Sequence, residues 1–194
     1  MKLAQLTSKS LILLDAVFDD RLAAIEALTD KLDQAGKLSD KQQFLDAVLK
    51  REDEGPTALG EYLAVPHGKS EAVKAPVFAC ALVKDELMWQ GLDGDEPVNM
   101  IFLLAIPPAE AGSTHMEVLT TLTSSLVEDE FREQLLAAKS ADEVMALFGG
   151  ESAQEEITEE QQPQVEMAKD ISRTAYPLVL GAGVLIATFL FLLL

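Results

Sequence analysis

The chain has 194 residues with 33 acidic and 15 basic side chains, so its formal net charge at pH 7 is −18. This acidity argues against a nucleic-acid partner, because phosphate backbones attract basic surfaces, and it fits either plain solubility or steering toward a basic protein surface. One cysteine excludes an internal disulfide, and two histidines supply a nitrogen–sulfur zinc site poorly, so no metal is expected.

The first elements of the predicted fold are a strand and a helix. The apolar run Leu11–Leu14 is typical of a strand, and it is too short for the hydrophobic region of a signal peptide. The globular part is therefore expected in the cytoplasm. Apolar residues then recur at helical spacing until Gly36, which predicts a helix over residues 20–35.

A second helix is predicted from Ser39, because Gln42 follows it at the spacing of a capping box. This helix carries Arg51 in its last turn. Two explanations for Arg51 stay open from the local pattern, a cation that stabilises the helix C-terminus or a group that faces a phosphate.

His67, one of the two histidines, lies in the segment Val-Pro-His-Gly. Tyr62–Val65 is a short apolar strand, and Pro66 and Gly68 indicate that no regular element continues through His67. A histidine displayed at a strand end is suited to metal binding, proton transfer or covalent phosphorylation. The alternative is a turn histidine that is bonded to a nearby carbonyl.

Two continuous apolar runs, Pro76–Val83 and Val98–Ile106, are typical of strands that are buried on both faces. Such strands need helices on each side of the sheet. The segment Leu92–Asp95 indicates a turn between them, and Trp89 is predicted to be a packed anchor without chemistry. Cys80 lies inside the first run and is predicted to be a buried, inert thiol.

His115 follows Thr114 and precedes Glu117, a capping-box pattern that makes His115 the first residue of a helix. Unpaired amides and the helix dipole favour an anion at that position. Two more helices are predicted near residues 131–136 and 140–148.

The C-terminal part separates into two segments of different composition. Residues 151–173 carry seven acidic and two basic groups, which is typical of a solvated linker or an exposed helix. Residues 175–194 are uncharged and, at about 1.5 Å per helical residue, reach the ~30 Å of a bilayer core. Lys169 and Arg173 precede them, so the positive-inside rule predicts an anchor at the inner face of the cytoplasmic membrane. A truncated permease helix and a disrupted gene are the alternatives for this tail.

The stretch Arg51–Lys69 resembles the phosphorylation motif of the enzyme IIA proteins of the bacterial phosphoenolpyruvate-dependent sugar phosphotransferase system (PTS). The class is type 2, which includes the fructose, mannitol and nitrogen proteins. The matching residues are Arg51, Gly55, Thr57, Gly60, Ala64, Pro66, His67 and Gly68. Trp89–Pro107 and His115 also match, so the resemblance spans roughly residues 5–148 and is closest to the fructose-like branch, including mannosylglycerate transport.

The resemblance implies a phosphotransferase that needs no cofactor. A neutral His67 would attack the phosphoryl group of phospho-HPr, hold it as phosphohistidine and pass it to a cysteine of enzyme IIB. This transfer would support uptake of a fructose-like sugar through a membrane enzyme IIC. Arg51 and His115 would stabilise the phosphate, with Thr57 and Gly60 as weaker members of its cradle.

The fold that the resemblance implies is α/β, a mixed sheet with helices on both faces, and it agrees with the buried strands and five helices expected from the residues. The expected organisation is a IIA domain at residues 1–150, an acidic linker at 151–173 and a transmembrane tail at 174–194.

Two other functions stay open. Nitrogen-type relatives carry a similar histidine and act through phosphorylation-dependent partner binding. A membrane-tethered interaction module with a decayed site is the second, although the presence of Arg51, His67 and His115 argues against decay.

Overall fold

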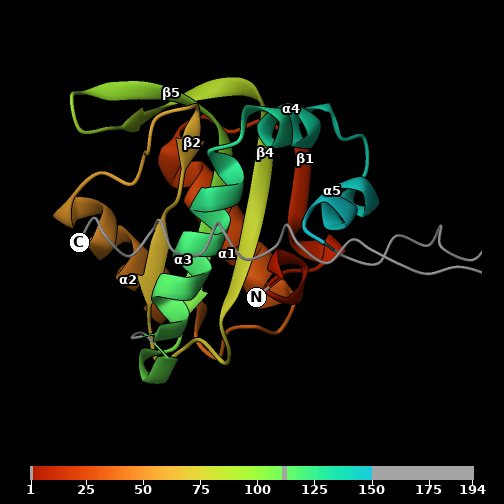
Figure 1. Ribbon diagram of the computed structural model, residues 1–194. Helices are drawn as coiled ribbons and strands as arrows, with labels where there is room; N and C mark the ends of the chain where they lie inside the picture. The colour runs from red at the N-terminus through yellow and green to blue at the C-terminus, as the bar shows by residue number, and fades with distance from the viewer. Residues whose placement is uncertain (1, 111–112, 150–194) are drawn as a thin grey trace, which may run out of the picture. The chain divides into compact units, whose positions relative to one another are not determined.

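The computed structural model describes residues 2–110 and 113–149 (Figure 1). The predicted linker and transmembrane tail lie outside these residues. Within the described ranges, no helix is both long enough and apolar enough to cross a bilayer. The described residues belong to one compact unit.

A five-stranded mixed sheet forms the centre of the fold (Figure 1). Its spatial order is β1, β4, β5 and β2, and β3 also pairs with β5. β4 and β5 form an antiparallel hairpin, and the remaining pairs are parallel. The strands are β1 (Ile12–Ala16), β2 (Leu63–Ala64), β3 (His67–Lys69), β4 (Val77–Gln90) and β5 (Asp95–Ile106). The predicted mixed α/β sheet is thus confirmed.

Five α-helices and three short 3-10 helices accompany the sheet in the described part of the chain. The α-helices are α1 (Arg21–Gln34), α2 (Lys41–Glu54), α3 (Ser113–Leu126), α4 (Asp129–Ala137) and α5 (Ala141–Leu147). The 3-10 helices are η1 (Leu3–Gln5), η2 (Lys9–Leu11) and η3 (Pro108–Glu110). α1 and α3 lie on opposite faces of the sheet (Figure 1).

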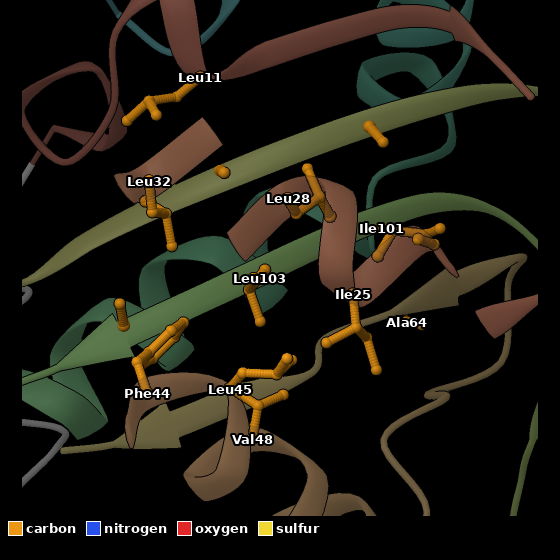
Figure 2. Packing of buried hydrophobic residues seen from close by; sticks show 14 of the residues in the cluster. Leu11, Ile25, Leu28, Leu32, Phe44, Leu45, Val48, Ala64, Ile101 and Leu103 are labelled. Atoms are coloured by element: carbon orange, nitrogen blue, oxygen red, sulfur yellow. The ribbon is translucent and has the colours of Figure 1, made fainter. Parts of the chain in front are cut away.

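Alternate residues of the central strands enter two separate hydrophobic cores. On one face, Ile101 and Leu103 of β5 pack with α1 and α2 (Figure 2). On the other face, Phe102 and Leu104 pack with residues of α3, α4 and α5. Each fully buried Leu or Phe contributes about 1.5–3 kcal/mol, so both faces of the sheet must be covered. This is the arrangement that the two uninterrupted apolar runs predicted.

Two helix starts differ from prediction by one or two residues. The N-cap of α2 is Asp40, whose carboxylate accepts from the Gln43 amide at 3.0 Å, whereas Ser39 donates its hydroxyl to the Ala72 carbonyl. Asp40 has the extended backbone of a cap residue, so the helix begins one residue later than Ser39 would allow. α3 begins at Ser113, which makes His115 its third residue instead of its first.

The two central strands are longer than their apolar runs. β4 continues past a bulge to Gln90, and the pairs Leu87–Val98 to Gln90–Asp95 extend the hairpin. Trp89 therefore lies within β4. It is fully buried, which confirms its role as a packed anchor. Cys80 is also buried, and burial raises the pKa of its thiol to about 12.

Candidate active site

His67 is the first residue of β3, so the prediction that no regular element includes it was wrong. This segment pairs in parallel with β5, with His67 in register with Leu104. The Leu104 amide donates to the Pro66 carbonyl, and the Ser70 amide donates to the Ile106 carbonyl. Proline before His67 does not prevent pairing, because only its carbonyl is needed.

The two ring nitrogens of His67 have different partners. Nδ1 lies 3.0 Å from the Val65 carbonyl oxygen, and Nε2 lies 3.1 Å from Nε of Arg51. A guanidinium can only donate and a carbonyl can only accept. The proton is therefore on Nδ1, and the Nε2 lone pair is directed at Arg51.

Arg51 reaches His67 from the last turn of α2, where the sequence placed it. Its Nη1 also donates to the Gly55 carbonyl at 3.0 Å, at the C-terminal end of the helix. The contact with the Gly55 carbonyl confirms the first explanation for Arg51, a cation at the helix C-terminus, while its facing a phosphate stays a prediction. Likewise, His67 is bonded to a nearby carbonyl, as the alternative for it held, and its chemical role stays a prediction.

Gly68 makes this pairing possible because it lets β3 approach α2 closely. A Cβ atom at this position would lie 2.7 Å from Cγ2 of Val48 and 2.9 Å from Cε2 of Phe44. Both neighbours are buried core residues. No side chain larger than hydrogen fits at residue 68 with this helix–strand distance.

A hollow of about 400 Å³ opens beside the imidazole, lined by Ala47, Lys50, Arg51, Glu54, His67 and Lys69. Its lining holds three cationic side chains and one carboxylate, which reverses locally the strong negative charge of the chain. Lys50 and Lys69 were not singled out from the sequence. Their positions flanking Arg51 and following His67 were the available signal.

The surroundings lower the pKa of His67. Burial is the main cause, and the positive charge of Arg51 acts in the same direction, while the hydrogen bond to the Val65 carbonyl opposes them. The imidazole is therefore neutral at pH 7. A neutral ring with its lone pair on Nε2 is the nucleophilic form of histidine.

The other predicted site residues lie in different places. His115 is in the first turn of α3, and its side chain lies outside what the structure describes. Thr57 is buried, and its hydroxyl donates to Oε1 of Glu52 at 2.6 Å. The Gly60 amide donates to Oε1 of Glu96. Neither Thr57 nor Gly60 lines the hollow beside His67.

Glu52 is a site-adjacent residue that the sequence reasoning missed. It is a buried carboxylate next to Arg51, and it accepts from Thr57 and from the Trp89 indole. Burial raises the pKa of Glu52, against the effect of these hydrogen bonds and of nearby arginines. A signal was present, because Phe44, Val48 and Glu52 follow at four-residue spacing and place an acid on the apolar stripe of α2.

Comparisons with known proteins show which family the chain resembles. Residues 5–149 match the family model described as phosphoenolpyruvate-dependent sugar phosphotransferase system, EIIA 2. The chain is 50% identical over 146 residues to the PTS system 2-O-alpha-mannosyl-D-glycerate-specific EIIABC component of Escherichia coli K12, which covers 75% of this chain and 22% of that protein. It is 34% identical over 138 residues to the PTS system fructose-specific EIIA component of Haloferax volcanii, covering 71% of this chain and 88% of that protein.

Solved structures share the fold. The nitrogen regulatory protein IIA-Ntr from Neisseria meningitidis aligns with a TM-score of 0.68 at 30% identity, over 75% of this chain and 97% of that one. The IIA component in a complex of mannitol enzyme IIA with phosphorylated enzyme IIB from Escherichia coli aligns with a TM-score of 0.63 at 25% identity, over 74% and 97%. The chain spans about a fifth of the length of the multidomain EIIABC relative. The chain therefore belongs to the EIIA 2 family of the phosphoenolpyruvate-dependent sugar phosphotransferase system.

Proposed function

We propose that the chain is a phosphocarrier in which Nε2 of His67 accepts a phosphoryl group from phospho-HPr and passes it to a cysteine of an enzyme IIB. The observation that carries this proposal is the fixed tautomer of His67, with Nδ1 bonded to Val65 and the Nε2 lone pair beside Arg51. Members of the family are phosphotransferases in the sugar phosphotransfer cascade. The chemistry is therefore of the class that the family performs.

The two transfers balance without a cofactor. In the first, Nε2 of His67 forms a bond to phosphorus while the donor's nitrogen–phosphorus bond breaks and leaves its electron pair on the donor nitrogen. In the second, a cysteine thiolate forms a bond to the same phosphorus while the Nε2–phosphorus bond breaks and leaves its electron pair on Nε2, so His67 returns to its neutral form. The proton stays on Nδ1 and remains hydrogen-bonded to the Val65 carbonyl throughout, so this bond stabilises the ring as it gains positive character.

The side chains around the hollow supply the electrostatic part of the proposal. Phosphoryl transfer depends on positioning and on charge stabilisation, so cations at the phosphate oxygens lower the barrier. Arg51 would turn its donors from Nε2 to the incoming phosphate, and Lys50 and Lys69 line the same space. His115, in the first turn of α3, is kept as a further hydrogen-bond donor to the phosphate because of the family resemblance.

The names of relatives support a fructose-like substrate class and an enzyme IIB partner. They include a mannosylglycerate-specific protein, a fructose-specific protein and a mannitol IIA bound to phosphorylated IIB. The sugar itself would be selected by enzyme IIB and a membrane enzyme IIC. A regulatory function is the second candidate, favoured by the 30% identity to a nitrogen regulatory IIA protein.

The proposed organisation has a cytoplasmic IIA domain at residues 1–150, an acidic linker at 151–173 and a membrane anchor at 174–194. The family match ends at residue 149, which supports the first boundary. The uncharged composition of the last twenty residues supports the anchor.

Labelling with radioactive phosphoenolpyruvate, enzyme I and HPr tests the phosphocarrier proposal. The wild-type chain should gain an acid-labile, alkali-stable phosphate, and His67→Ala should gain none. Arg51→Ala should label slowly, and Arg51→Lys should recover only part of the rate because an ammonium lacks the planar fork. Normal labelling of His67→Ala would refute the assignment of the nucleophile.

Adding an enzyme IIB to the labelled protein separates the two candidate functions. A transport component should lose its phosphate to the IIB cysteine rapidly. A regulatory phosphoprotein should keep it, and its binding to a partner should change with phosphorylation.

A further inference from the structure

Three buried polar side chains meet beneath the site and have no part in the chemistry described above. They are Glu52 from α2, Thr57 from the loop that follows, and Trp89 from β4, and they are 5%, 2% and 0% exposed. The Thr57 hydroxyl donates to Oε1 of Glu52 at 2.6 Å. The Trp89 indole donates to Oγ1 of Thr57 at 3.0 Å and to Oε2 of Glu52 at 3.2 Å.

Two hydrogen-bonded connections run from Thr57, one toward Arg51 and one toward His67. Through its side chain, Thr57 holds Glu52, which adjoins Arg51 in the last turn of α2. Through its main chain, the Thr57 carbonyl accepts from the Val65 amide at 2.9 Å, and the Val65 carbonyl accepts from Nδ1 of His67. Thr57 thus links the segment that carries the arginine to the segment that carries the imidazole.

The loop between these segments gives Arg51 its second contact. Gly55, whose carbonyl accepts from Nη1 of Arg51, lies two residues before Thr57. When the Thr57 hydroxyl is tied to Glu52, the Gly55 carbonyl is held at the end of α2. Any displacement of Thr57 that moved the Gly55 carbonyl would change the hydrogen bond that orients the guanidinium plane, and with it the 3.1 Å contact to Nε2 of His67.

We propose that Glu52, Thr57 and Trp89 are positioning residues that set the distance and orientation between Arg51 and Nε2 of His67 for phosphoryl transfer. This inference rests on the proposed phosphocarrier function for its kinetic consequence. Its structural consequence, the fixed tautomer of His67, is independent of that function. A buried carboxylate is costly unless it is fully hydrogen-bonded, so its presence here is explained by the geometry that it enforces.

The Thr57→Val variant tests the proposal because valine has nearly the same shape and lacks the hydroxyl. Since displacements near 1 Å can cost roughly 100-fold in rate, we expect phosphoryl transfer from phospho-HPr to the full-length variant to fall roughly 10- to 100-fold. Thr57→Ser keeps the hydroxyl and should restore most of the rate. Transfer by Thr57→Val within twofold of wild type would overturn the proposal.

Thr29→Val is the matched control. Thr29 is a fully buried threonine of α1 whose hydroxyl has no hydrogen-bond partner among the described residues. This substitution makes the same chemical change away from His67 and should leave transfer unchanged. Comparing the two variants separates loss of the network from a general effect of valine in the core.

A double variant distinguishes positioning through Arg51 from a direct contact with phosphate. If the network acts through Arg51, adding Thr57→Val to Arg51→Ala should cause little further loss, because the residue being positioned is absent. Fully additive losses would overturn the proposal and favour direct phosphate contact by Thr57.

The ring nitrogens of His67 supply a readout that needs no phosphate. ¹⁵N chemical shifts of the unphosphorylated wild type should show a protonated Nδ1 and an unprotonated Nε2, and Thr57→Val should shift them toward tautomer averaging. A merely structural role would lower the unfolding temperature and leave these shifts unchanged. If the wild-type protein accepts no phosphate, the proposed phosphocarrier function is refuted. The ¹⁵N chemical shifts of His67 still test whether the buried network positions its ring.

Trp89→Phe provides a second variant if Thr57→Val does not fold. It removes the indole N–H and leaves a smaller aromatic ring in the core, at the end of the network that contacts neither Arg51 nor His67. We expect a smaller decrease in transfer, roughly 3- to 10-fold, with the same direction of ¹⁵N shift change. Unchanged shifts and transfer in a folded Trp89→Phe variant would refute a role for the indole.

Discussion

At the scale of single residues, the chemistry of the site is decided by what surrounds one imidazole. Val65 and Arg51 fix the proton on Nδ1, and burial together with the charge of Arg51 lowers the pKa of His67. Both effects favour the neutral ring with its lone pair on Nε2. The same arginine that would stabilise a phosphate thus also keeps the acceptor unprotonated.

The pH dependence of His67 follows from this arrangement. An unperturbed histidine titrates near pH 6.5, so phosphoryl acceptance should persist below that pH and be lost only as the pH falls through the lower folded-state pKa. NMR titration is practical because the chain has two histidines. Removal of the positive charge in Arg51→Ala should raise the pKa of His67.

The same shift has a consequence for stability. Between about pH 6.5 and the lower folded-state pKa, the unfolded chain binds a proton that the folded chain does not, so His67 makes the protein less stable as the pH falls through this window. Denaturation of His67→Ala should lack this contribution. A folded-state pKa at or above that of a free histidine would contradict both expectations.

At the scale of secondary-structure elements, the site depends on how closely α2 and β3 approach each other. Gly68→Ala would place a methyl group 2.7 Å from Val48 and 2.9 Å from Phe44, inside the core. We expect a loss of about 1–3 kcal/mol in the free energy of unfolding, measured with urea. Because the helix must move away, transfer from phospho-HPr should fall well beyond what the lost stability explains.

Gly36→Ala is the control for that substitution. Gly36 has a φ of +68° and open space around its Cα, so alanine there costs roughly 1 kcal/mol of backbone strain without a clash. It follows α1, away from the hollow, and should leave transfer unchanged. Equal losses of transfer in the two variants would show that stability and not helix–strand distance controls the rate.

A second junction, between α3 and α4, depends on the largely buried Arg132. Its Nη1 donates to the carbonyls of Leu126 and Val127 at the end of α3, and its Nη2 pairs with Asp129 and Glu61. The two carboxylates are mostly exposed, so the carbonyl contacts carry most of the stabilisation.

Arg132→Met should therefore lower the free energy of unfolding by about 2–3 kcal/mol, because it leaves two helix-end carbonyls without their donor. Arg21→Met is the control, since the hydrogen bond of the Arg21 side chain within the described residues is a long, exposed contact with Gln90, and its charge reaches Glu52 only through space. The control should change stability by less than about 0.5 kcal/mol in the same urea titration. Equal effects of the two substitutions would contradict this account of the junction.

At the scale of the whole molecule, every residue proposed for the chemistry precedes residue 150 in the sequence, and the family match covers residues 5–149. A chain cut after Gly150 should therefore be soluble and accept phosphate from HPr at nearly the full-length rate. The full-length protein should sediment with membranes and resist carbonate extraction, because twenty uncharged residues are costly to leave in water. A fully soluble full-length protein would contradict the anchor, and a truncated chain that accepts no phosphate would contradict the domain boundary.

The sequence alone determined that β4 and β5 are strands and that α1 and α2 are helices. Burial on both faces leaves continuous apolar runs in the two strands, and burial of one face leaves helical periodicity in the two helices. It also placed Arg51 at the end of a helix, since local spacing carries that information. Element ends were less certain. Because His67 pairs with β5, regular structure includes His67. The N-cap of α2 is Asp40, one residue after Ser39.

Only the tertiary structure decided which side chains meet. The contact of Arg51 with His67 spans 16 positions, and the bond from Trp89 to Glu52 spans 37. Local patterns carry no information on contacts between residues so far apart in the sequence, because these contacts follow from how α2 packs on β3 and β4. Trp89 and Thr57 were therefore recognised as an anchor and as a family match, while the buried carboxylate that joins them became evident only when the elements were assembled.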